Sequence, residues 1–95
     1  MNRLSLFSAA DLQTSMKEWL ISQRKNQKLS RDRLAEISTV PSSTIKKFET
    51  TGQISFRQFL LLWQSVDDLQ RLQSLTEISS IKTDKPMSIE EVLKG

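Results

Sequence analysis

The stretch that decides the fold is Arg31–Glu49, which reads RDRLAEISTVPSSTIKKFE. Ser30 stands directly before it and can cap a helix that begins at the first residue of this stretch. A tight turn is expected at Ser38–Val40. Pro41 then fits the mouth of a second helix, because its missing N–H costs little at that position. Two short helices joined by a turn of three or four residues form a helix-turn-helix unit.

The apolar residues of this stretch fit the close crossing of two such helices. Ala35 is small enough to lie where the helices touch, and Leu34 and Ile37 point to the same side. The residues expected to fill the space between the helices are Leu34, Val40, Ile45 and Phe48. This packing leaves the outer face of the second helix free to enter a major groove of DNA.

Two helices outside this unit are indicated by caps and by apolar spacing. One begins near Ser8, where Asp11 completes a capping pair, and Asp67 can cap the other. The apolar stripe of the first helix consists of Leu12, Met16, Trp19 and Leu20. The last helix carries Leu69, Leu72 and Leu75.

A strongly apolar helix is expected between them, from Phe56 to about Ser65. Gly52 ends the preceding helix as a left-handed C-cap, and Ser55 with Gln58 forms a capping box. Because the helix is apolar on nearly all sides, we expect it to be central. The sequence therefore predicts five helices and an all-α fold.

The 95 residues suffice for one domain, which we place at residues 1–78. Residues 79–95 are expected to form a flexible tail that is extended or folds on a partner. Within it, Ser88 and Glu91 form another capping box, but a helix of about seven residues is not stable alone in water. The residues that would share its apolar face and bind a partner are Ile89, Val92 and Leu93.

The composition excludes several classes of function. The chain has no Cys and no His, which excludes Cys/His metal sites and His-dependent nucleophilic catalysis. It has no Gly-rich phosphate loop, so we expect no enzyme and no cofactor. No apolar run reaches the ~18–20 residues that a membrane span needs, and the N-terminus lacks the apolar segment of a signal peptide. We therefore expect a cytoplasmic protein, with no membrane contact.

Positive charge is concentrated in the middle of the chain. Residues 24–57 carry eight Lys and Arg against three carboxylates, whereas the flanking segments are slightly acidic. A basic centre of this kind suits a polyanion such as nucleic acid. The alternative is an ordinary solvated face with an excess of Lys and Arg.

The motif residues resemble those of the XRE-type (Cro/CI-repressor-like) helix-turn-helix regulators. The residues that match the family pattern are Leu34-Ala35, Val40, Thr44-Ile45 and Glu49. The following stretch, FETTGQIS, is similar to that of HipB-like antitoxins. The resemblance covers about Met16 to Leu75 and implies a five-helix lambda-repressor-like DNA-binding domain.

Two residues depart from the family pattern, and both lie in the turn. Thr39 stands where the family has Gly, and a left-handed backbone there costs a non-Gly residue on the order of 1 kcal/mol. Pro41 stands where the family has a capping Ser, which removes one side-chain cap. Neither change touches the outer face of the second helix, but both bear on the geometry of the turn.

The resemblance also implies roles for individual residues. Ser42, Ser43 and Lys47 match base-reading positions, and Thr44 and Lys46 lie beside them. The residues implied in phosphate contact are Arg31, Gln53 and Arg57. The alternative for Lys46 and Lys47 is a solvated helix face. Leu61 is usually polar and exposed in the family, so here it either belongs to a dimer or partner interface or lies in a fully buried helix.

The function that the resemblance implies is that of a sequence-specific transcriptional repressor and antitoxin of a type II toxin-antitoxin system. Such a protein binds double-stranded operator DNA with an inverted repeat as a homodimer, represses its own operon and binds a HipA-like serine/threonine kinase toxin. Two alternatives remain. One is a non-catalytic interaction subunit with a degenerate helix-turn-helix, and the other is a stand-alone phage-type repressor.

Overall fold

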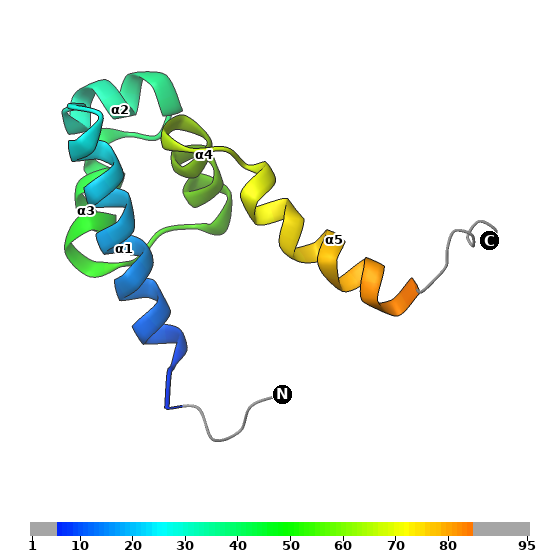
Figure 1. Cartoon of the computed structure of the whole chain (residues 1–95). Coiled ribbons are helices and arrows are strands. Elements are labelled where there is room, and N and C mark those ends of the chain that lie inside the picture. Colours follow the sequence, from blue (N-terminus) through cyan, green and yellow to red (C-terminus); the bar gives the residue numbers. More distant parts are fainter. Residues whose placement is uncertain (1–5, 85–95) are drawn as a thin grey trace.

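The computed structural model describes residues 6–84, with side-chain surroundings through residue 77. This part of the chain is all-α, as the sequence predicts, and contains five helices (Figure 1). The helices are α1 (Ala9–Asn26), α2 (Arg31–Ser38), α3 (Ser42–Thr51), α4 (Phe56–Val66) and α5 (Gln70–Asp84). None of these helices combines the length and the apolar character that a membrane crossing requires.

The caps expected from the sequence begin three of the helices. Ser8 and Asp11 form a reciprocal capping box at α1, with bonds of 2.9 and 3.1 Å. Ser30 accepts the backbone N–H of Arg33 at α2. Ser55 accepts the N–H of Gln58 at α4, but its hydroxyl also donates to the Gln58 side chain, so this box is not the reciprocal one expected.

The turn between α2 and α3 keeps a left-handed residue although no glycine is present. Thr39 has φ +65°, and its backbone N–H donates to the carbonyl of Ala35 at 2.9 Å. The hydroxyl of Ser38 accepts the N–H of Val40 at 3.1 Å, which supports the next residue of the turn. Pro41 is the N-cap residue of α3 and makes no side-chain cap bond. The turn therefore has a left-handed shape that costs Thr39 about 1 kcal/mol of backbone strain.

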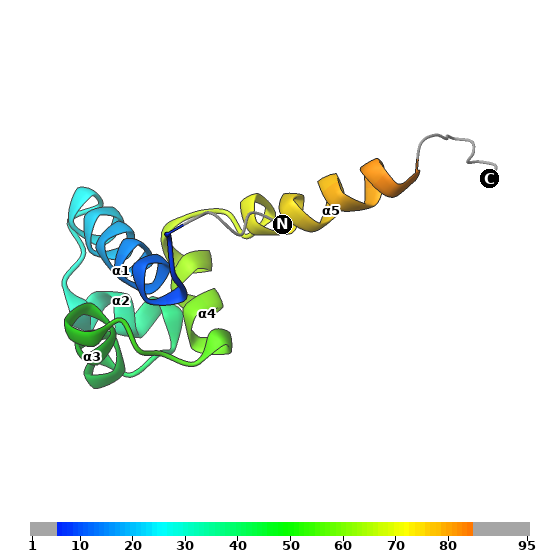
Figure 2. The same ribbon diagram turned by 90° about the horizontal axis from the view of Figure 1, so that it is seen from below.

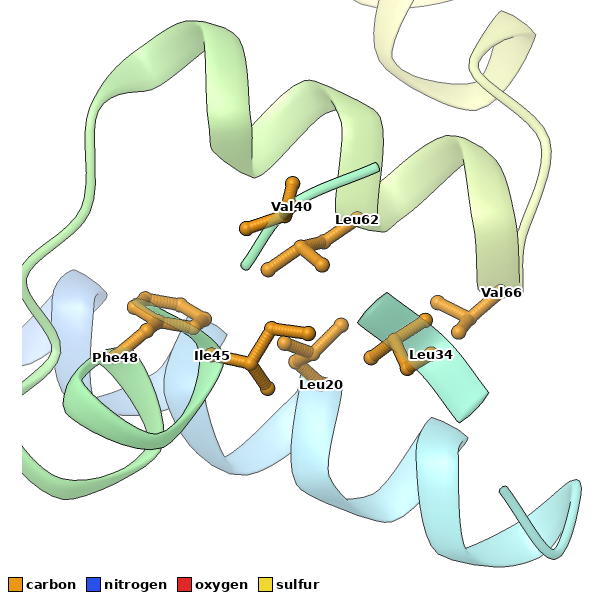
Figure 3. Packing of buried hydrophobic residues seen from close by; sticks show 7 residues of the cluster. All are labelled: Leu20, Leu34, Val40, Ile45, Phe48, Leu62 and Val66. Atoms are coloured by element: carbon orange, nitrogen blue, oxygen red, sulfur yellow. The ribbon is translucent and has the colours of Figure 1, made fainter. Parts of the chain in front are cut away.

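The core lies where four helices meet (Figure 3). Leu20 of α1 and Leu62 of α4 are both fully buried, and they belong to one cluster with residues from α2, the turn and α3. The cluster consists of Leu20, Leu34, Val40, Ile45, Phe48, Leu62 and Val66. All four residues expected to pack between α2 and α3 are in it, so their place in the core is confirmed.

Aromatic contacts join α1 to α4 and fix the start of α5. The rings of Trp19 and Trp63 lie 4.3 Å apart between centroids. Trp63 also donates its indole N–H to the carbonyl of Asp68 at 3.0 Å, and the Arg71 guanidinium lies 5.8 Å above its ring. From this anchor α5 leads away from the body formed by the other four helices (Figures 1 and 2).

Two expectations about burial are wrong. Ile37 does not share the buried side of Leu34, because it lies close to the end of the short α2, where the chain turns, and is 45% exposed. α4 buries Leu62, Trp63 and Val66 but not its whole circumference, since Phe56 in its first turn is 75% exposed. The helix therefore covers the core with one face, and its apolar first turn lies at the surface.

Two expectations about the last helix are also corrected. Asp67 ends α4, and it is Asp68 that accepts the N–H of Gln70 at the start of α5. The segment 79–84 is helical rather than extended, because α5 continues to Asp84. Residues 70–84 contain neither Gly nor Pro, so no residue of this segment breaks a helix. The predicted tail helix around Ile89 lies outside the described residues.

Candidate nucleic-acid interface

A surface hollow of about 520 Å³ lies where the N-terminal ends of α2 and α3 come together. Its lining consists of Arg24, Ser30, Arg31, Asp32, Ser42, Ser43 and Lys46. Because Pro41 supplies no side-chain cap, no capping side chain covers the first backbone N–H groups of α3. The uncapped start of α3 and the side chains of Arg31 and Lys46 favour an anion at this hollow, whereas the Asp32 carboxylate in the same lining opposes one.

Arg24, which lines this hollow, forms a buried ion pair with Glu49. Arg24 donates from Nε to Oε2 of Glu49 at 2.7 Å and from Nη2 to Oε1 at 3.0 Å. Its Nη1 donates to the carbonyl of Leu29 at 2.9 Å. The Glu49 side chain is 2% exposed and that of Arg24 10%, so this pair lies inside the protein. Since all three guanidinium nitrogens of Arg24 are engaged, this residue is structural.

Arg31 shares the same carboxylate but remains at the surface. Its Nε donates to Oε1 of Glu49 at 2.8 Å, and its side chain is 44% exposed and lines the hollow. Burial raises the pKa of Glu49, but the hydrogen bonds and charges of Arg24 and Arg31 lower it more, so the pKa lies below its ordinary value of 4.5. Glu49 is therefore ionised and holds Arg31 at the mouth of the hollow.

Sequence reasoning missed the pairing of Arg24 with Glu49. Glu49 directly follows the core residue Phe48, but neighbouring residues of a helix point in different directions, as the exposed Lys47 on the other side of Phe48 shows. The sequence therefore carries no local signal that Glu49 is buried. The choice of Arg24 among the basic residues of the segment was not readable, because it depends on how α1 crosses α3.

The residues expected to read bases lie on α3, and the structure brings only some of them to the hollow. Ser42, Ser43 and Lys46 line it, together with Arg31 of α2. Lys47 is exposed on the same helix, and Thr44 is half-buried there, but neither lines the hollow. The outer face of α3 thus presents hydroxyl groups and two cations beside one another.

The two further phosphate candidates lie apart from this group. Gln53 is exposed after the end of α3, where its backbone N–H donates to Thr51 Oγ1 at 3.1 Å. Arg57 is exposed in the first turn of α4. Neither residue lines the hollow, so the structure does not gather them with Arg31.

The predicted partner residues have different outcomes. Leu61 is half-buried, packs against the core and lines a second hollow of about 440 Å³ with Ile37. It is therefore neither fully exposed nor fully buried. The other three partner candidates, Ile89, Val92 and Leu93, lie outside the described residues.

Three comparisons with known proteins found no match to this chain. No family model matches the chain. Neither the curated proteins nor the solved structures contain a significant match to it.

Proposed function

We propose that this chain is a sequence-specific DNA-binding repressor in which α2 and α3 act as a helix-turn-helix. One observation carries the proposal. Arg31, Ser42, Ser43 and Lys46 converge on one open hollow at the N-terminal ends of the two helices. In this arrangement α3 enters the major groove and the start of α2 rests on the DNA backbone.

The candidate DNA-contact residues, of which only Arg31, Ser42, Ser43 and Lys46 line the hollow, divide into two roles. Arg31, held at its Nε by Glu49, bonds a phosphate together with the uncapped N–H groups at the start of α3. The base edges are faced by Ser42, Ser43 and Lys47, with Thr44 and Lys46 beside them. Lysine donates hydrogen bonds to guanine, and serine can form hydrogen bonds with several different bases. Gln53 and Arg57 contact backbone further along the duplex. Phosphate contacts position the domain, and base contacts give it sequence preference.

A single domain of this size reads too few base pairs for useful specificity. We therefore propose a homodimer on an inverted-repeat operator, with half-sites about 34 Å apart, one helical turn of DNA. In such a dimer, each protomer places its own α3 on one of the two half-sites.

The antitoxin role is proposed on the resemblance to HipB-like proteins. In that role the repressor controls its own operon in the cytoplasm and binds a HipA-like serine/threonine kinase, with contacts from Leu61 and from the C-terminal residues Ile89, Val92 and Leu93. Titration calorimetry of the purified chain with such a kinase tests this part separately from DNA binding. The absence of heat on mixing would leave a stand-alone repressor.

The test of the main proposal is fluorescence anisotropy with labelled DNA from upstream of the protein's own gene. A duplex of the same length and composition in scrambled order serves as the control. We expect binding at least tenfold tighter to the upstream DNA, about 1.4 kcal/mol, at physiological salt. Equal, weak binding to both duplexes would contradict sequence-specific recognition and favour the alternative, an interaction subunit with a degenerate helix-turn-helix.

A further inference from the structure

Three charged side chains from three different helices meet around one carboxylate. They are Arg24 of α1, Arg31 of α2 and Glu49 of α3. Oε1 of Glu49 accepts from both arginines, at 3.0 Å from Nη2 of Arg24 and at 2.8 Å from Nε of Arg31. The Arg24 side chain is 10% exposed and that of Arg31 is 44% exposed. One carboxylate therefore joins an interior arginine to a surface arginine.

The guanidinium of Arg31 keeps one end open. Its Nε is bonded to Glu49, whereas Nη1 and Nη2 have no hydrogen-bond partner among the residues whose side chains the structure describes. Arg31 lines the hollow at the helix starts, and Glu49 is not among the lining residues. The two terminal nitrogens of a guanidinium lie side by side and match two oxygens of one phosphate. The open end of Arg31 is therefore the end that can bind a phosphate.

Arg24 compensates the negative charge of Glu49. It donates two of the three hydrogen bonds that the carboxylate accepts, so the charge of Arg31 is not cancelled by Glu49. The two guanidinium groups and the one carboxylate together leave one net positive charge. This charge matters because Asp32 lines the same hollow and repels an anion. Without Arg24, Glu49 would neutralise Arg31 and the repulsion by Asp32 would remain.

We propose that Arg24 and Glu49 are positioning residues for the phosphate contact of Arg31. Arg24 fixes Glu49, and Glu49 fixes Arg31 so that its two terminal nitrogens bind one phosphate of the DNA backbone while Nε keeps its bond to the carboxylate. This inference rests on the proposed DNA-binding function and adds two residues that do not contact DNA themselves. A guanidinium that is already held in its binding geometry loses less side-chain entropy when the phosphate binds.

Two other roles of the ion pair predict different effects of losing the carboxylate. If Glu49 withheld Arg31 from DNA, the loss would tighten binding. If the pair only stabilised the fold, the loss would weaken binding whether or not Arg31 is present. Positioning predicts a third pattern, in which the loss weakens binding only when Arg31 is present.

A double-variant cycle on the full chain separates these roles. Anisotropy titrations compare the native chain, Glu49→Gln, Arg31→Ala and Arg31→Ala/Glu49→Gln on the upstream DNA and on the scrambled duplex. We expect Glu49→Gln to weaken binding by about tenfold, although it removes a negative charge from the protein. The loss should be equal on both duplexes, because a phosphate contact carries no sequence information. In the Arg31→Ala background, Glu49→Gln should change affinity by less than about twofold.

Arg31→Lys tests the orientation without altering the interior of the protein. Lysine keeps the positive charge but offers neither the Nε donor nor two terminal nitrogens side by side. We expect this variant to bind both duplexes about tenfold more weakly. The matched control is Arg33→Lys, because Arg33 is also on α2, pairs with Glu36 at the surface and does not line the hollow. It should bind like the native chain. Circular dichroism checks that each variant is folded under the conditions of the titration.

A spectroscopic measurement follows the bond between Glu49 and Arg31 directly. Nitrogen-15 NMR of the full chain detects the Nε–H group of Arg31, which is assigned through its loss in Arg31→Lys. We expect a slowly exchanging signal in the native chain that broadens in Glu49→Gln and persists when the upstream duplex is added. Loss of the signal on addition of DNA would mean that phosphate replaces Glu49, and it would overturn the proposal.

The outcomes separate this inference from the proposed function. Tighter binding by Glu49→Gln, equal weakening with and without Arg31, or native affinity of Arg31→Lys would each overturn the positioning role while DNA binding by the native chain stands. If Glu49→Gln does not fold, Arg31→Lys and the NMR signal of the native chain decide. Equal affinity of the native chain for the two duplexes would contradict a sequence-specific repressor, but the cycle would still measure the phosphate contact. The absence of binding to either duplex would contradict both proposals.

Discussion

Arg24 and Glu49 form a two-point ion pair inside the protein, with Nε–Oε2 and Nη2–Oε1 distances of 2.7 and 3.0 Å. The pair joins α1 to α3 across 25 residues of sequence. Because Glu49 also holds Arg31, the same carboxylate links the interior of the domain to the proposed DNA-binding surface.

Removal of one member of this pair should lower the unfolding free energy more than removal of both members. Glu49→Leu leaves Arg24 buried and uncompensated, and we expect a loss of about 3–5 kcal/mol of unfolding free energy. Arg24→Met/Glu49→Leu removes both buried charges and should cost less than Glu49→Leu alone. Urea unfolding followed by circular dichroism measures both. Additive losses in the double variant would contradict a coupled pair.

The lowered pKa of Glu49 makes stability depend on pH in acid. A carboxylate whose pKa is lower in the folded chain stabilises it above the unfolded pKa, and this contribution is lost as pH falls through the folded pKa. We therefore expect unfolding free energy to fall as pH drops below about 4.5. Glu49→Gln should be less stable at neutral pH and show a shallower decline in acid. A decline of unchanged steepness in that variant would assign the acid sensitivity to other carboxylates.

Thr39 is strained by its left-handed backbone, so glycine should suit the position better. Thr39→Gly is expected to raise unfolding free energy by about 1 kcal/mol without weakening DNA binding. The control is Thr50→Gly in the last turn of α3, where the backbone is helical, so glycine should lower stability by about 0.5 kcal/mol. Thermal unfolding distinguishes the two changes. Destabilisation by Thr39→Gly would mean that the turn does not adopt φ +65° in solution.

Truncation of two neighbouring leucines of α4 should lower the unfolding free energy by very different amounts. Leu62 is fully buried, and Leu62→Ala is expected to cost about 3 kcal/mol through lost burial and a cavity. Leu61 is half-buried beside the second hollow, and Leu61→Ala should cost about 1 kcal/mol. Chemical unfolding of both variants tests the rotation of α4. Equal losses would mean that the helix presents a different face to the core.

Local signals in the sequence were sufficient for most of the fold. Caps at Ser8 and Ser30 and the apolar spacing of Ile45 and Phe48 depend on residues a few positions apart, and the structure agrees with them. The left-handed Gly52 at the end of α3 was readable for the same reason.

Features that depend on how helices cross were not predictable. The choice of Arg24 as the partner of Glu49 and the exposure of Ile37 follow from the placement of α1 and α4. The sequence predicts that the last helix ends before Ile78, whereas α5 continues to Asp84. The polar residues between Ile78 and Pro86 resemble a loop in composition, although none of them breaks a helix. The apolar hollow of about 620 Å³ that α1, α4 and α5 line together, with Leu12, Phe59 and Leu72 among its residues, likewise depends on how these helices pack.

The measurement that tests the central claim most directly is the affinity of the charge-reversed recognition helix for the upstream DNA. Anisotropy titrations across a salt series compare the native chain, Lys46→Glu/Lys47→Glu, and the control Lys17→Glu/Lys25→Glu, which makes the same charge change on α1. We predict tight binding by the native chain with affinity that falls steeply with salt. The α3 variant should lose sequence-selective binding, and the α1 control should retain the preference for the upstream sequence. Equal affinity of the native chain and the α3 variant would contradict DNA recognition by this helix.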